Sequence, residues 1–150
     1  MRKDSIIIDA KVILGLFRAA DTSKDIHRDV YKLLVKLHDK FSLYFVQKEI
    51  TSEEMSIIRD TSEKQFPGFN YQVIVCSDLS VLHADYFVGV SMYDCKLVGV
   101  KSICVRDSFN SSFEFDGIYC VNSAADLLCY FESEIDSAGD DTRERLLLEV

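Results

Sequence analysis

Short apolar runs alternate along this chain with longer segments in which apolar residues recur every three or four positions. The runs are rich in β-branched residues and predict buried strands at residues 5–9, 42–46, 71–76, 102–106 and 118–121. The periodic segments predict helices over residues 11–20, 24–39, 80–94 and 123–135, with an acid-rich helix between residue 47 and a loop at Pro67. This alternation predicts an α/β protein, a three-layer sandwich around a mostly parallel sheet.

Composition limits the chain to one compact domain. It has 150 residues, of which 48% are hydrophobic, so it can bury a core but has little room for a second one. We expect the domain to span residues 1–135 and an acidic tail to follow at 136–150. The tail ends in the apolar run Leu146–Leu148, which suits a protein partner or a second copy of the chain, so we expect a homo-oligomer.

Charge and cysteine content narrow the function classes. The net charge of −8 argues against a general basic surface for nucleic acid and fits either solubility or carboxylates gathered around a divalent metal ion. The five cysteines form no CxxC pair and several lie in apolar runs, so we expect buried, reduced thiols. No signal peptide is evident and no apolar run approaches ~20 residues, so we expect a cytoplasmic protein without a membrane span.

Four acidic positions fall where strands and helices of such a sheet begin or end. Asp9 closes the first predicted strand and Asp107 follows a later one, so both are expected at the carboxyl edge, where parallel sheets bind ligands. Glu53 or Glu54 lies early in the helix after the second strand, and Asp85 lies near the start of a later helix. Each also has an ordinary interpretation as a helix cap, a turn residue or part of a solvated helix face.

Carboxylates gathered at one edge favour metal-dependent chemistry. They repel one another, and a hard cation such as Mg²⁺ or Mn²⁺ relieves that repulsion. Such an ion activates water and stabilises charge on a phosphoryl oxygen, which suits phosphodiester hydrolysis without a histidine or cysteine nucleophile.

The order of these motifs resembles that of the PIN-domain nucleases. IIIDAKVILGLF looks like the opening strand, acid and helix of that family, and LYFVQKEITSEE looks like its acid-bearing helix, where Glu53 fits better than Glu49 or Glu54. The third acid looks like Asp85 in LHADYFVGVSMYD, the fourth looks like Asp107 in SICVRDSF, and GIYCVNSAADLLCYF looks like the closing strand and helix. The resemblance covers roughly residues 5–131 and implies a PIN-like three-layer α/β/α sandwich.

The resemblance also implies an activity, that of a metal-dependent endoribonuclease. Its catalytic residues would be Asp9, Glu53, Asp85 and Asp107. Of these, Asp9, Asp85 and Asp107 would hold Mg²⁺ or Mn²⁺ while water attacks the phosphorus atom in line. RNA would be the substrate, and the many relatives that are ribonuclease toxins imply an antitoxin or another protein partner.

Two positions depart from the family pattern. Lys11 stands where Asn or Ser would help to hold the metal site, and Val105 stands where Thr or Ser would supply a hydroxyl. Losses of this kind lower metal affinity or activity by ~10–100-fold. The Lys11 ammonium has three open roles: an ion pair with Asp9 or Asp107 that competes with the metal, binding of a substrate phosphate, or exposure to solvent. Arg106 is a second candidate for the phosphate.

Two other functions therefore stay open. A PIN-like binding or scaffold module that has lost catalysis would account for Lys11 at the edge of the metal site. A receiver-like α/β domain would also carry acids at strand ends, but the chain shows neither the acid pair before the first helix nor the late lysine of such a domain. It also has no Gly-rich phosphate loop.

Overall fold

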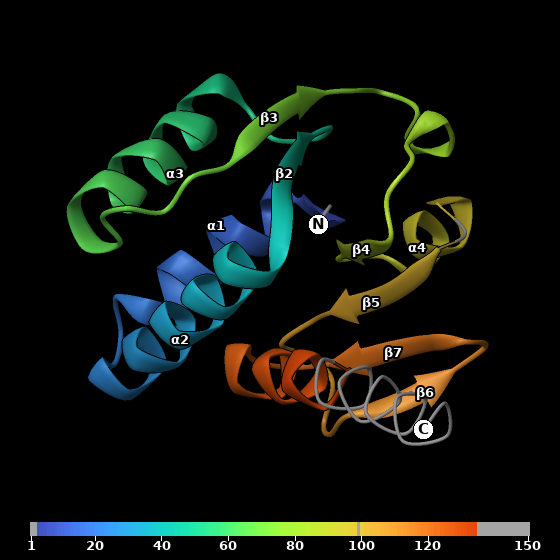
Figure 1. The fold of residues 1–150 in the computed structure, drawn as a ribbon. Coiled ribbons are helices and arrows are strands. Elements are labelled where there is room, and N and C mark those ends of the chain that lie inside the picture. Colours follow the sequence, from blue (N-terminus) through green and yellow to red (C-terminus); the bar gives the residue numbers. More distant parts are fainter. Residues whose placement is uncertain (1–2, 99, 135–150) are drawn as a thin grey trace, which may run out of the picture.

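A computed structural model of the chain describes residues 3–98 and 100–134, which form one seven-stranded sheet with helices on both faces (Figure 1). The strands are β1 (Asp4–Asp9), β2 (Phe41–Gln47), β3 (Gln72–Val75), β4 (Tyr86–Gly89), β5 (Lys101–Val105), β6 (Phe113–Phe115) and β7 (Ile118–Val121). The helices are α1 (Ala10–Ala20), α2 (Lys24–Lys40), α3 (Ser52–Gln65), the short 3₁₀ helix η1 (Leu79–Val81), α4 (Met92–Val98) and a helical segment over residues 124–134. The predicted α/β/α sandwich is confirmed; the predicted tail at 136–150 lies outside the described residues.

The strand order is β3-β2-β1-β4-β5-β7-β6, and every pairing is parallel except that of β6 with β7. β1 therefore lies in the interior of the sheet, with β2 on one side and β4 on the other. The register aligns Asp9 with Val46 of β2 and Ile8 with Val88 of β4. As predicted, Asp9 ends the first strand, and this strand lies inside the sheet.

Two apolar layers explain why β1 is apolar along its whole length. Ile6 and Ile8 point to one face, where α1, α2, α3 and the segment at 124–134 cover the sheet. Ile7 points to the opposite face, which α4 and η1 cover. A strand that is covered on both faces needs apolar residues at successive positions, and all three isoleucines are at most 2% exposed.

The prediction of one helix over residues 80–94 was wrong. The structure divides this stretch among η1, the buried strand β4 and the beginning of α4. Four apolar residues in a row do not distinguish a short buried strand from a helical segment by periodicity alone. Phe87 and Val88 are fully buried on opposite faces of the sheet, which is the pattern of a central parallel strand.

The prediction also lacked the edge strand β6. The chain reverses between β6 and β7 through Asp116 and Gly117, whose φ angles are +55° and +79°. Both values lie in the left-handed region, and an Asp-Gly pair is the usual sequence of a two-residue hairpin turn of this kind. This signal was present in the sequence.

The cysteines largely follow the prediction of buried thiols. Cys95, Cys104 and Cys120 are free and buried against the sheet face that α4 covers. Cys76 is partly buried and Cys129 is exposed, and both are also free. The buried three pack as small apolar side chains.

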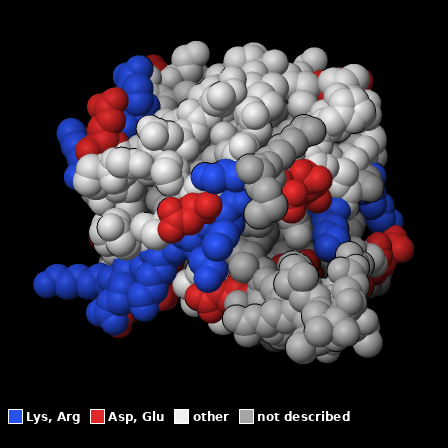
Figure 2. All heavy atoms as spheres, viewed as in Figure 1, with Lys and Arg blue, Asp and Glu red and all other residues white. Residues whose placement is uncertain are grey.

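Surface charge on the described part of the chain is mixed in sign. In Figure 2, lysine and arginine gather where Figure 1 places α2, on which basic residues recur every fourth position: Lys24, Arg28, Lys32, Lys36 and Lys40. Asp25, Asp29 and Asp39 belong to the same helix, so α2 carries charges of both signs. None of the helices within the described ranges has the length and apolar character needed to cross a membrane.

Candidate functional site at the carboxyl edge of the sheet

Within the sheet, the chain changes from one side of β1 to the other, and this switch point lies beside Asp9. The chain passes from β1 to β2 on one side and later returns through β4 on the other side. Parallel sheets bind ligands outside the carboxyl ends of their strands at such a switch point. Since Ile8 is aligned with Val88, the turn that follows Gly89 begins next to Asp9.

Asp9 is a nearly buried carboxylate, with 3% of its surface exposed. It is the N-cap of α1, because its Oδ1 accepts a hydrogen bond of 2.9 Å from the backbone N–H of Lys11. Burial raises the pKa of the Asp9 carboxyl, the charges of Asp94 and Glu49 raise it as well, and the Lys11 N–H and ammonium lower it. Asp9 is thus confirmed as a helix cap. Its side chain is nearly buried, however, and burial disfavours the charged form of a carboxyl group.

Asp94 is the second nearly buried acid at this edge, and the sequence interpretation did not single it out. It lies in the first turn of α4 and is 7% exposed, and its backbone N–H donates to Ser91 Oγ at 3.1 Å. A signal for it existed, since Ser91 and Asp94 repeat the spacing of Ser123 and Asp126, where Ser123 Oγ also accepts from the backbone N–H of the acid. The mistaken helix over 80–94 had concealed this helix start.

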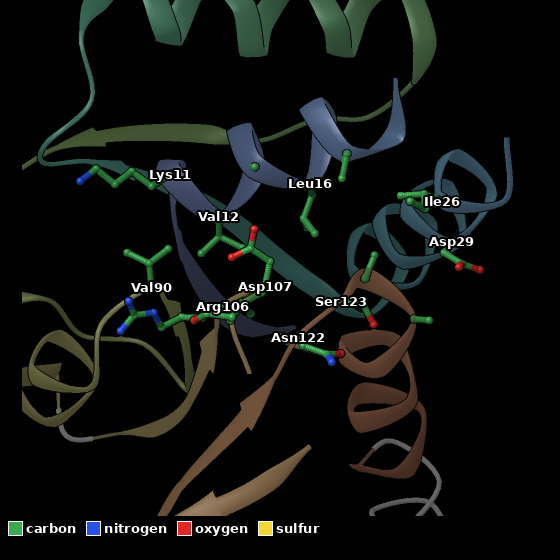
Figure 3. A pocket seen from close by; sticks show the side chains of 16 residues that line it. Lys11, Val12, Leu16, Ile26, Asp29, Val90, Arg106, Asp107, Asn122 and Ser123 are labelled. Carbon is green, nitrogen blue, oxygen red and sulfur yellow. The ribbon is translucent and has the colours of Figure 1, made fainter. Parts of the chain in front are cut away.

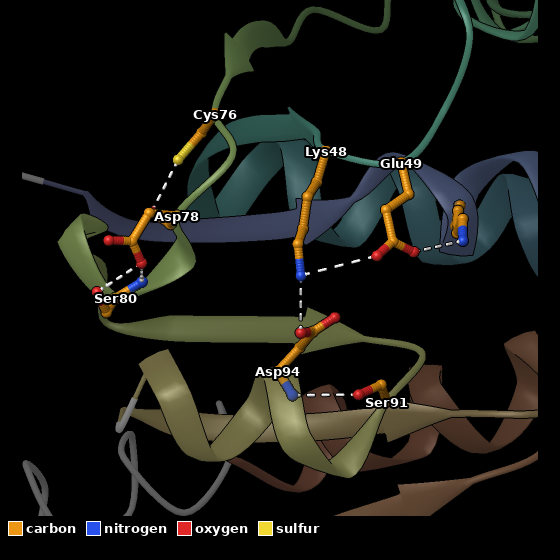
Figure 4. Close-up of polar contacts among 8 residues, drawn as sticks. Lys48, Glu49, Cys76, Asp78, Ser80, Ser91 and Asp94 are labelled. Atoms are coloured by element: carbon orange, nitrogen blue, oxygen red, sulfur yellow. Dashed lines mark hydrogen bonds and ion pairs between the residues drawn. The ribbon is translucent and has the colours of Figure 1, made fainter.

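Two lysines form ion pairs with acids of this edge (Figure 4): Lys48 with Asp94 and Glu49, and Lys11 with Glu49. Lys48, which follows β2, places its Nζ 3.1 Å from Asp94 Oδ1 and 4.0 Å from Glu49 Oε1. Its side chain is 19% exposed and that of Asp94 10%, so this is a largely enclosed ion pair. The hydrogen bond to Asp94 raises the pKa of the Lys48 ammonium, burial lowers it, and the charges of Asp94, Glu49 and Asp9 raise it. We call Asp9, Asp94, Glu49, Lys48 and Lys11 the acid–lysine cluster.

Lys11 does not pair with Asp9 or Asp107. Its Nζ lies 2.9 Å from Glu49 Oε2, and its side chain is 38% exposed. The ion pair proposed for Lys11 is therefore present with a different partner. A metal ion at this edge would meet Lys48 as its competitor instead, because Lys48 is the lysine that pairs with a nearly buried acid.

Asp85 lies at the opposite, amino edge of the sheet, which corrects its predicted position. It precedes β4 rather than a helix, and its Oδ2 accepts a 2.8 Å hydrogen bond from the backbone N–H of Ser5, near the start of β1. Asp9 ends the same strand, so the length of β1 separates the two carboxylates. Asp85 connects the beginnings of β1 and β4 and does not contribute to a site at the carboxyl edge.

Of the three glutamates that the sequence left open, Glu49 is the one that lies in the acid–lysine cluster. Glu53 is exposed in the first turn of α3. Glu54 completes the capping box of that helix with Thr51 and lies 4.0 Å from Arg18. Glu49 contacts both lysines of the cluster, so it is the one that belongs to the site.

Asp107 and Arg106 are at the carboxyl edge as predicted, but apart from the cluster. Asp107 is exposed in the loop after β5, and β4 lies between β5 and β1. Both residues line a cavity of about 530 Å³ between α1, this loop and the start of the segment at 124–134 (Figure 3). Val105, the other departure from the family pattern, is buried in the wall of the same cavity.

Asp9 and Asp94 are the carboxylates that a divalent ion at this edge would use. Within residues 3–98 and 100–134, no three His, Cys, Asp or Glu side chains are grouped closely enough to hold a metal ion. Mg²⁺ commonly takes one or two carboxylates and completes its shell with water and substrate phosphate, and a carboxylate has about four acceptor positions. A divalent ion at this edge would therefore have Asp9 and Asp94 as its nearly buried protein ligands, and the Lys48 ammonium already pairs with Asp94 Oδ1.

Comparison of the sequence with models of known protein families gave no match, and a search of curated proteins gave none either.

The charge of Asp9 is expected to lower stability at neutral pH. The pKa of its carboxyl is above the ordinary 3.8, so the folded state binds more protons than the unfolded state between the two values, and stability falls as pH rises through that window. Asn keeps the cap without the charge. We expect Asp9→Asn to be more stable than wild type at pH 7, with a difference that closes below the ordinary pKa, as measured by urea unfolding across this pH range.

Asp9→Ala, which removes the cap, should be about 1 kcal/mol less stable than Asp9→Asn. An Asn variant less stable than wild type at pH 7 would contradict this.

Proposed function

We propose that the carboxyl edge hydrolyses phosphate esters, with Asp9 as the general base. One observation carries the proposal: a carboxylate that is 3% exposed lies at the switch point of the sheet, where burial and, to a lesser degree, the charge of Asp94 raise the pKa of Asp9. Ser, Thr or Asn would cap α1 equally well without a buried charge. A carboxyl group whose pKa is raised by burial is suited to taking a proton from water at neutral pH.

In the proposed reaction, Asp9 takes a proton from a water molecule whose oxygen attacks the phosphorus atom. The bond from phosphorus to the ester oxygen breaks, and the leaving alkoxide takes a proton from solvent. The proton on Asp9 then returns to solvent, so the net reaction consumes one water. The Lys48 ammonium, which reaches the same edge from the end of β2, would offset the charge of the phosphate oxygens.

A bound Mg²⁺ or Mn²⁺ would neutralise further phosphate charge. In that form Asp9 and Asp94 would hold the ion, and the ion would supply the activation of water in place of Asp9. The PIN-like endoribonuclease predicted from the sequence is one form of this chemistry, with an RNA phosphodiester as the ester. It would have to work without Asp85 and Glu53, since neither lies in the cluster. We therefore propose the broader class of phosphate esters and keep RNA as one substrate to test.

A binding module without catalysis is the second candidate. The observation that favours it is the ion pair of 3.1 Å between Lys48 and Asp94, in which a lysine already neutralises the carboxylate that a metal ion would use. In a binding module, Lys48 would take the role that the sequence had suggested for Lys11, that of an ammonium paired with an acid of the metal site.

Hydrolysis by the purified full chain tests the two candidates against each other. The substrates are p-nitrophenyl phosphate, bis-p-nitrophenyl phosphate and a short RNA, each with Mg²⁺, with Mn²⁺ and with a chelator. The proposal predicts turnover of at least one substrate above the uncatalysed rate. Failure with all three under every condition would reject hydrolysis and favour the binding module.

Replacement of Lys48 should strengthen metal binding. Lys48→Met removes the ammonium that holds Asp94 and leaves that carboxylate free for a cation. We expect the affinity for Mn²⁺ to rise by about tenfold, which corresponds to about 1.4 kcal/mol, as measured by calorimetry. Lys32→Met, on the exposed outer side of α2, is the matched control and should leave the affinity unchanged. An equal or weaker affinity in Lys48→Met would show that this lysine does not compete with the ion.

A further inference from the structure

The cavity of about 530 Å³ lies next to the acid–lysine cluster and shares a residue with it (Figure 3). Lys11 donates its backbone N–H to Asp9, pairs with Glu49 through its ammonium and also lines the cavity. Val90 lines the cavity from the turn after β4, which begins beside Asp9. A molecule with its phosphate at Asp9 would therefore have this cavity within reach of its remaining atoms.

The cavity walls are mostly apolar, and charged side chains of both signs lie around them, with Asp107 beside Val12 and Asp29 near Ile26 (Figure 3). Figure 3 shows Val12 and Leu16 of α1 between two sides, with Lys11, Val90 and Arg106 on one side and Ile26 on the other. The two cations are thus on the same side as Val90, the residue that follows β4. This arrangement suits an anionic group near Lys11 and an apolar group extending along α1 toward Ile26. The volume lies in the range of small-molecule sites, which is about 300–1,000 Å³.

Gly15 leaves the α1 side of the cavity open. It lies within the helix, where glycine is less stable than alanine, and it lines the cavity. Apart from its chain neighbours and the backbone of its own helix, a Cβ atom placed on Gly15 would meet no described atom within 4 Å, so neither packing nor backbone conformation requires a glycine.

We propose that this cavity binds the organic group of the substrate, and that the substrate is a phosphate monoester of a small, largely apolar alcohol, aromatic or branched. This inference rests on the proposed hydrolysis at Asp9 for its phosphate end. The cavity supplies the rest, since Val12, Leu16 and the open space at Gly15 form a surface for a flat apolar group. Burial of that group, rather than contacts along a polymer, would then provide most of the affinity.

Binding of two phosphonates, which cannot be hydrolysed at their P–C bond, tests this without catalysis. Calorimetry on the full chain compares 1-naphthylmethylphosphonate with methylphosphonate, which has the same anionic group and no ring. We expect the naphthyl compound to bind at least about tenfold more tightly to wild type. We expect Gly15→Leu, which fills the cavity, to abolish this preference without weakening methylphosphonate binding. Gly15→Ala is the matched control and should keep most of the preference.

The outcomes separate this inference from the proposed function. Leucine and alanine both favour helix over glycine, so thermal unfolding should show that both variants are folded. An absent naphthyl preference in wild type, or an unchanged one in Gly15→Leu, would overturn the cavity as the site of the organic group. A preference that Gly15→Leu removes would support the cavity, even if wild type hydrolyses no ester, a result that would reject only the proposed hydrolysis.

Discussion

Asp9→Asn is expected to lower phosphate ester hydrolysis by about a hundred- to ten-thousandfold, the range typical of a lost general base. An Asn side chain retains an acceptor for the Lys11 N–H, so α1 keeps its cap, but it takes no proton from water. The loss should appear in kcat with little change in KM, because the removed group acts on the attacking water rather than on substrate affinity. Initial rates with p-nitrophenyl phosphate measure both constants.

Glu53→Gln is the control for this measurement. Glu53 is exposed in the first turn of α3 and outside the cluster, so its neutralisation should leave the rate within about twofold of wild type. The PIN-like arrangement predicts the reverse for this residue, since Glu53 would be one of its four acids. A rate for Asp9→Asn equal to that of wild type, with both proteins folded, would remove Asp9 from the reaction.

Phe45→Ala should produce the largest loss of stability, about 3–5 kcal/mol of unfolding free energy. Phe45 is fully buried in β2, and its ring stacks on Tyr71 with 4.3 Å between ring centroids. Truncation leaves a cavity between the sheet and the segment that leads into β3, which the surrounding chain can fill only in part. Urea unfolding followed by circular dichroism gives the free energy of both proteins.

Val75→Ala provides a comparison at the neighbouring edge strand. Val75 belongs to β3, which pairs with β2, and it is 80% exposed. Its truncation should change stability by less than about 0.5 kcal/mol, because little apolar area leaves a packed environment. Similar losses in the two variants would mean that the face of β2 on which Phe45 lies is not a packed core.

Most of the fold follows from patterns that act over a few residues. The run Ile6–Ile8 is apolar on both faces because β1 is covered on both faces, and this is visible in the sequence alone. The stripe through Val30, Leu33, Leu34 and Leu37 likewise predicts α2 and its buried side. The pattern failed at β4, where four apolar residues are too few to show a period.

The candidate site was less predictable because it depends on pairings between distant segments. The position of Asp9 followed from the end of a strand, but that of Asp85 depended on the mistaken helix at 80–94. Once β4 replaces that helix, Asp85 moves to the amino edge and Asp94 to the carboxyl edge. Lys48 joins Asp94 across 46 positions of the chain, and no local spacing indicates such a contact.

The most direct test of the account compares Asp94→Asn with Asp85→Asn in the same hydrolysis assay. Asp94 belongs to the acid–lysine cluster, whereas Asp85 lies at the far edge of the same sheet. We predict that Asp94→Asn lowers kcat/KM by at least about tenfold, the lower end for loss of a group that supports a metal or its ligands, while Asp85→Asn stays within about twofold of wild type. A loss confined to Asp85→Asn, with Asp94→Asn fully active, would contradict the assignment of the reaction to this cluster.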